Sequence, residues 1–278
     1  MTQQTKSHPT HVSQTEEAPG VSARRKPAPP HRVSALDRVR SAALWGQGLA
    51  WLLPWTSSLI ALNRTLGADK IQAANRLFCT GMLKSTGAKW KAVVDPAVKD
   101  DETYVFAQNH VNHLDFVTMH NATPHFKQGI ELESHFRYPF YGWFMSSRGT
   151  IAVPVARKHR LQRVREQMEA EVAKKHSILV FPEGTRTPNG RVGAFRHGTF
   201  MMARDLGLKV VPTAVTGMFE VMRKGSLVLK PGEVTVYCDA PVDFTGLSNV
   251  EVKEQAERVR AQVASRVDAH IAEYWGES

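Results

Sequence analysis

The 278-residue sequence is poor in cysteine and in acidic residues, and each shortage excludes a class of protein. Its two cysteines, Cys79 and Cys238, lie far apart in the chain. No disulfide framework or cysteine-based zinc site can be built from them, and we expect a reducing compartment. Asp and Glu number 26 against 36 Lys and Arg, which leaves a net charge of +10. A surface this basic favours an anionic partner, such as a phosphorylated metabolite, an anionic membrane surface or nucleic acid.

Residues 1–34 lack aromatic side chains altogether and contain five prolines. Such a segment cannot bury enough apolar surface to offset the entropy of ordering, so we predict a disordered leader over 1–34. The leader also lacks the basic, then apolar, then cleavable pattern of a signal peptide.

A charge-free run of apolar residues covers 42–62 and contains three of the six tryptophans. As a helix it would be long enough to cross a bilayer, but Gln47, Pro54 and a Thr-Ser-Ser cluster interrupt it. Together with a second helical pattern over 68–86, it predicts a membrane-associating helical pair over 35–86. We expect this pair to lie in the membrane surface at the cytoplasmic face of the inner membrane, because the basic leader opposes export. The alternative is that both helices simply cover the core of the domain.

Residues 87–278 alternate short apolar runs with helical patterns, which is typical of an α/β domain with a central sheet flanked by helices. We predict strands over 104–108, 129–132, 150–155, 178–181, 210–216, 226–229 and 234–237. Amphipathic helices are predicted over 161–172, 198–206 and, after a capping box at Ser248, over 248–271.

The strongest candidate for chemistry is the segment Asn-His-Val-Asn-His-Leu-Asp at 109–115, directly after a predicted strand. His110 and Asp115 are five residues apart, about 140° on a continuous helix, so they can meet only if His110 lies in the turn before the helix. Asn112 is suited to cap that helix. A carboxylate behind an imidazole fixes its tautomer and supports the cation that forms when the ring takes a proton. This pattern predicts a general base at the carboxyl edge of the sheet.

Three further blocks follow strands or form them. Phe-Pro-Glu-Gly-Thr-Arg at 181–186 brings Glu183, Gly184, Thr185 and Arg186 into one turn, where a guanidinium and exposed backbone N–H groups suit a phosphate. Residues 149–157 form a strand that delivers Arg157 at its end. Residues 211–214, Val-Pro-Thr-Ala, are mostly apolar and carry no chemistry by themselves.

Taken in order, these four blocks resemble those of the glycerolipid acyltransferase family, which includes bacterial 1-acylglycerol-3-phosphate acyltransferases. The resemblance covers roughly 85–240 and departs from the family at Val111-Asn112, where a small polar pair is usual. It implies an enzyme without a cofactor that acylates a lysophospholipid, with acyl-CoA or acyl-carrier protein as co-substrate and phosphatidic acid as product. It further implies that His110 is the base and Asp115 orients it. Arg157 and Arg186 would hold the glycerol phosphate, and Glu183, Gly184 and Thr185 would shape that pocket.

Two other classes of function remain open at this point. His110, His113 and Asp115 could serve a metal-dependent hydrolase, although no His-Glu-x-x-His is present and the 181–186 block would be unexplained. A binder without activity is the second alternative, most plainly a lipid-binding relative. The sequence has no interleaving of aromatic and basic residues typical of RNA recognition, so we expect no nucleic-acid partner.

Overall fold

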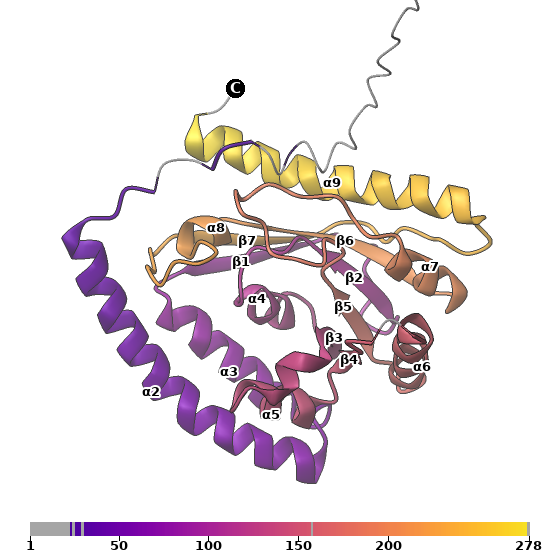
Figure 1. Ribbon diagram of the computed structural model, residues 1–278, viewed down its shortest axis with the longest axis horizontal. Helices are drawn as coiled ribbons and strands as arrows, with labels where there is room; N and C mark the ends of the chain where they lie inside the picture. Colours follow the sequence, from indigo (N-terminus) through magenta and orange to yellow (C-terminus); the bar gives the residue numbers. More distant parts are fainter. Residues whose placement is uncertain (1–22, 24–25, 29–30, 157, 277–278) are drawn as a thin grey trace, which may run out of the picture.

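The computed structural model describes residues 23, 26–28, 31–156 and 158–276. The leader predicted over 1–34 therefore lies mostly outside the described residues, and so does Arg157. Within the described part, one seven-stranded sheet is flanked by helices on both faces (Figure 1), as the sequence predicts.

The sheet has the order β1-β7-β6-β2-β5-β3-β4. All neighbouring pairs are parallel except β6 and β7. The central strand β2 is buried at every residue, which a run of apolar and aromatic side chains accounts for. The strands are β1 (Lys89–Val94), β2 (Tyr104–Gln108), β3 (Lys127–Leu132), β4 (Ile151–Val153), β5 (Ser177–Val180), β6 (Lys209–Thr216) and β7 (Glu233–Cys238).

The helices form a layer on each face of the sheet (Figure 1), and each layer has its own hydrophobic core. One layer consists of α2 (Ala35–Leu66), α3 (Gln72–Ser85), α4 (Asp115–Ala122) and α5 (Tyr141–Arg148), with the 3-10 helix η1 (Glu133–Arg137) beside α5. The short helix α8 (Met218–Val221) also contributes side chains to the first core. The other layer consists of α6 (Arg160–Val172), α7 (Gly198–Asp205) and α9 (Asn249–Trp275). The capping box expected at Ser248 is present at the start of α9.

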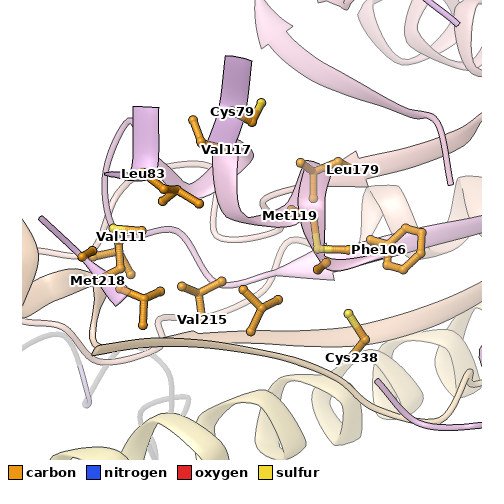
Figure 2. Close-up of a cluster of buried hydrophobic side chains, with 14 of the residues drawn as sticks. Cys79, Leu83, Phe106, Val111, Val117, Met119, Leu179, Val215, Met218 and Cys238 are labelled. Atoms are coloured by element: carbon orange, nitrogen blue, oxygen red, sulfur yellow. The ribbon is translucent and has the colours of Figure 1, made fainter. Parts of the chain in front are cut away.

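Both cysteines are small residues of the first core (Figure 2). Cys79 and Cys238 are buried and unpaired, and burial raises the pKa of each thiol to about 12. Val111, from the segment that follows β2, reaches the same core and lies near Met218 in Figure 2. The loop that carries His110 is thus anchored by an apolar side chain one residue further on.

The strand predicted over 226–229 is wrong. This segment runs beside α2, and its backbone bonds to side chains of that helix rather than to a strand. The Ser41 hydroxyl donates to the carbonyl of Leu229 and accepts from its N–H, while the indole of Trp45 donates to the carbonyl of Leu227. Strand β1 was not predicted, because as an edge strand it is largely exposed and carries no clear apolar alternation.

The N-terminal helical pair is present as α2 and α3, which pack against each other and against the first core. Pro54 lies inside α2, where a proline removes a backbone hydrogen bond. Among the described residues, no helix has both the length and the apolar character needed to cross a membrane.

Candidate active site

His110 and Asp115 meet at the carboxyl end of the central strand, as their spacing predicts. The ring Nδ1 of His110 lies 2.8 Å from Oδ2 of Asp115. The side chain of Asp115 is fully buried, whereas that of His110 is 22% exposed. Because Nδ1 faces the carboxylate, Nε2 is the nitrogen that can accept a proton from a bound molecule. The geometry is that of an oriented general base.

The Asp115 carboxylate organises the whole turn. Its Oδ2 also accepts from the backbone N–H groups of Val111 at 2.6 Å and Asn112 at 3.0 Å. Burial raises the pKa of Asp115, and these hydrogen bonds oppose the shift. Helix α4 begins at Asp115 rather than at Asn112, so the predicted capping role of Asn112 is wrong. A carboxylate in the first helical turn is favoured by the helix dipole.

Asparagine side chains connect this turn to β6 and α8. The side-chain amide of Asn109 exchanges two hydrogen bonds with the backbone of Val215. This side chain thus extends the contact between β2 and β6 beyond the end of β2. The amide of Asn112 donates to the carbonyls of Met218 and Met222, at the two ends of α8. Asn112 therefore holds the loop against α8.

The 181–187 segment clamps the backbone of His110. Glu183 accepts from the N–H of His110 through Oε1 at 2.9 Å, and from the N–H of Gly193 through Oε2 at 2.8 Å. The N–H of Thr187 donates to the carbonyl of His110 at 2.7 Å. The ring of Phe181 stacks on the imidazole with centroids 4.1 Å apart. Two blocks distant in sequence thus fix both the backbone and the ring plane of one histidine.

The remaining residues of this block lie at the surface of the site. Gly184 adopts a φ of +64°, and a Cβ there would lie 2.6 Å from the Arg196 guanidinium carbon. Thr185 is exposed and Arg186 is partly exposed. Desolvation by neighbouring atoms and then the positive charge of Arg186 lower the pKa of His113, although the His113 side chain is exposed. Arg186 therefore lies close to the turn that carries His110.

The cationic character of this region extends past the predicted residues. The Lys224 ammonium donates to the carbonyl of Arg186 at 3.1 Å, and Arg196 lies over Gly184. Arg157, the other predicted phosphate ligand, belongs to the part of the chain that the structure does not describe. Lys224 was not predicted, since only the tertiary fold brings it to the 181–187 segment.

A cavity of about 1000 Å³ lies elsewhere, between α9 and the β1–β7 edge of the sheet. Glu220, Glu233 and His270 are among the residues that line it, whereas His110, Asp115 and residues 183–186 are not. In the part of the chain that the structure describes, no three His, Cys, Asp or Glu side chains are placed to hold a metal ion.

An α/β sheet with an oriented His–Asp pair at a strand end is an arrangement suited to general-base chemistry. The family model described as Acyltransferase matches residues 92–216, which contain this site. The resemblance found in the sequence is confirmed over residues 92–216, which match the acyltransferase domain.

Individual relatives agree with this assignment. A chloroplastic 1-acyl-sn-glycerol-3-phosphate acyltransferase of Arabidopsis thaliana is 33% identical over 51% of this chain and 40% of its own length. One from Chlamydomonas reinhardtii is 30% identical over 72% of this chain and 62% of its own length. The chain thus spans about two fifths to three fifths of these relatives. In fold, it is similar to the 1-acyl-sn-glycerophosphate acyltransferase PlsC of Thermotoga maritima, with a TM-score of 0.69 at 20% identity over 84% of this chain and 95% of that one.

Proposed function

We propose that this chain transfers a fatty acyl group from a thioester donor to the hydroxyl of a lysophospholipid. The donor is acyl-CoA or acyl-carrier protein, and the acceptor is 1-acylglycerol-3-phosphate, which gives phosphatidic acid. The observation that carries the proposal is the 2.8 Å contact between His110 Nδ1 and the buried Asp115 carboxylate. The names of the relatives supply the substrate class, since they are 1-acyl-sn-glycerol-3-phosphate acyltransferases.

The reaction proceeds by direct transfer. Nε2 of His110 takes the proton of the acceptor hydroxyl as its oxygen attacks the thioester carbonyl. The carbon–sulfur bond breaks, an ester bond forms, and the departing thiolate recovers a proton from the imidazolium. Asp115 stabilises that imidazolium and keeps Nδ1 protonated. The sequence contains no Gly-x-Ser-x-Gly segment, and this route needs no acyl-enzyme.

The 181–187 segment contributes in two ways. Glu183 accepts two backbone N–H groups while only 4% exposed, so its main effect is to hold His110 in register with the pocket. Arg186 and Arg157 bind the phosphate of the acceptor through charge-assisted hydrogen bonds. Gly184 and Thr185 form the exposed lip of that subsite.

The helical pair docks the domain on a membrane at the cytoplasmic face. Six large aliphatic side chains of α2 are at least 39% exposed, namely Leu36, Val39, Leu49, Leu53, Leu62 and Leu66. With Trp45 also exposed, such a helix suits the boundary between headgroups and acyl chains. Protease digestion of sealed vesicles tests this orientation. A tag on the N-terminus and the catalytic domain should be cut from the same, cytoplasmic side, and a tag cut only from the opposite side would contradict the proposal.

Transfer of a radiolabelled acyl chain tests the proposed activity. Purified protein should acylate 1-acylglycerol-3-phosphate faster than lysophosphatidylcholine and lysophosphatidylethanolamine, because only the first presents a terminal phosphate. Running acyl-CoA and acyl-carrier protein side by side identifies the donor. Binding of the acceptor without transfer from either donor would instead favour a lipid-binding relative, and release of free fatty acid alone would favour a hydrolase.

A further inference from the structure

Exposed aromatic side chains gather where η1 passes into α5. Tyr138 is 56% exposed, Phe140 42% and Trp143 49%, and Leu132 just before η1 is 46% exposed. We call residues 138–143 the aromatic turn. Large apolar residues are common singly at protein surfaces, but three aromatic rings within six residues form a patch.

The backbone holds this turn in an unfavourable conformation. Phe140 has φ 60° and ψ −58°, a region that bulky residues avoid because of the clash of their Cβ with the backbone. Its ring contacts that of Trp143, with centroids 5.4 Å apart. Burying the Phe140 ring within the protein does not explain the strain, because the ring remains 42% exposed. Strain of this kind persists where the surrounding structure enforces it, and it clusters at active sites, ligand clamps and switch regions.

A carboxylate below the turn enforces the conformation. Oε1 of Glu131 accepts from the N–H of Leu132 and lies 2.8 Å from Nδ1 of His135. Its Oε2 accepts from the hydroxyl of Tyr141 at 2.7 Å. Glu131, near the end of β3, thus bonds to His135 before the turn and to Tyr141 within it, and Tyr138 and Phe140 lie between these two residues.

The aromatic turn lies near the turn that carries His110 and beside α2. Glu131, which bonds to the aromatic turn, lies close enough to His113 for its charge to oppose the desolvation that lowers the His113 pKa, and His113 is three residues from His110. On the other side, α5 packs against α2, where Asn63 donates to the hydroxyl of Ser147 at 3.1 Å. Figure 1 shows α2 and α5 in the layer opposite α9. The aromatic turn therefore belongs to the same layer as α2, the helix that we propose to dock on the membrane.

We propose that the aromatic turn inserts into the boundary between headgroups and acyl chains of the bilayer, as a second membrane contact next to the active site. Tyrosine and tryptophan favour this boundary, where one end of the ring is apolar and the other wet. The exposed Arg137 in η1 and Arg64 at the end of α2 supply positive charge toward an anionic lipid surface. A lipid surface is favoured over a protein partner because these arginines match its charge and because α2, which packs against α5, carries further exposed apolar side chains. The inference rests on the proposed function only in that the acceptor is a lipid.

Sedimentation with vesicles of phosphatidylglycerol and phosphatidylcholine tests the contact without any acyl donor, so its outcome is separate from that of the activity assay. Losing one half-exposed ring from the turn should lower the partition coefficient about fivefold. The variants are Tyr138→Ser and Phe140→Gly, the second of which also relieves the backbone strain and so should not lower the melting temperature. Tyr274→Ser is the matched control, since Tyr274 is 64% exposed on α9 in the opposite layer. It should bind vesicles as the unaltered protein does.

Vesicle binding that stays within twofold in both turn variants would overturn the proposal, and so would an equal loss in Tyr274→Ser. A second measurement reports directly how deeply the Trp143 ring enters the bilayer. Lipids with brominated acyl chains should quench the protein's tryptophan emission less in Trp143→Phe than in Trp275→Phe. If the turn variants convert a dimer to a monomer with vesicle binding unchanged, the patch is a contact between copies of this chain and the membrane proposal fails.

Discussion

The substitution Glu183→Gln separates a residue that positions the base from one that touches substrate. The two carboxylate oxygens accept from the N–H groups of His110 and Gly193 at 2.9 and 2.8 Å, and the residue is 4% exposed. A glutamine keeps the size of the side chain but has only one oxygen. Its amide N–H group then faces one of the two backbone donors, which is left without an acceptor in a buried place.

The expected loss of stability follows from the one hydrogen bond that Glu183→Gln removes. An unsatisfied buried donor costs about 1–3 kcal/mol, which for a chain of this size lowers the melting temperature by about 5 °C. If His110 moves by about 1 Å as a result, kcat falls on the order of 10²-fold, because the base no longer reaches the acceptor hydroxyl. The KM for the acceptor should change little, since neither oxygen of Glu183 is needed for the phosphate.

Calorimetric melting and steady-state acyl transfer measure the two effects. Glu254→Gln is the matched control, since Glu254 is 61% exposed on α9 and makes only a 3.9 Å ion pair with Arg258. It should leave both the melting temperature and kcat unchanged. A Glu183→Gln enzyme with normal melting and kcat but a raised acceptor KM would refute the positioning role and return Glu183 to the substrate pocket.

Three other substitutions have defined outcomes. Asp115→Asn should lower kcat by about 10²–10⁴ with little change in acceptor KM, because it disturbs the tautomer of His110; a change confined to KM in steady-state kinetics would argue against this. Arg186→Lys should mainly raise the KM for the phosphorylated acceptor, since lysine lacks the bidentate fork; if only the donor KM rises, Arg186 belongs to the donor site. Burial lowers the pKa of Lys127 from 10.5 to about 7, so between these two pH values the folded chain binds up to one proton fewer than the unfolded chain. The free energy of unfolding should therefore rise with pH across this window and level off above it, by at most about 1.4 kcal/mol per unit from this residue, and urea titrations of Lys127→Met should lack that rise.

The pairing of His110 with Asp115 was predictable because it depends on local geometry. A five-residue spacing across a strand end and a helix start has few solutions, and the apolar run of β2 marks where the strand ends. The proximity of the 181–186 block was predictable for a related reason, since the carboxyl ends of β2 and β5 meet at one edge of a parallel sheet.

What depends on contacts between distant segments was not predictable. Residues 226–229 have the composition of a strand, but Ser41, almost two hundred residues earlier, takes both backbone hydrogen bonds of Leu229. From the sequence, Glu183 is expected to shape the phosphate pocket. Only the fold shows that its two oxygens accept from backbone N–H groups. The exposed aromatic turn could not be predicted, because its residues follow no periodic pattern and because distant side-chain contacts with Glu131 hold it.

The substitution His110→Ala decides whether His110 is the base for acyl transfer. The ring lies at the edge of the site, 22% exposed, so its removal should leave the fold intact by circular dichroism and melting. We predict that kcat for transfer of a radiolabelled acyl chain to 1-acylglycerol-3-phosphate falls by about 10²–10⁴. A folded His110→Ala protein with a kcat near that of the unaltered enzyme would contradict the account.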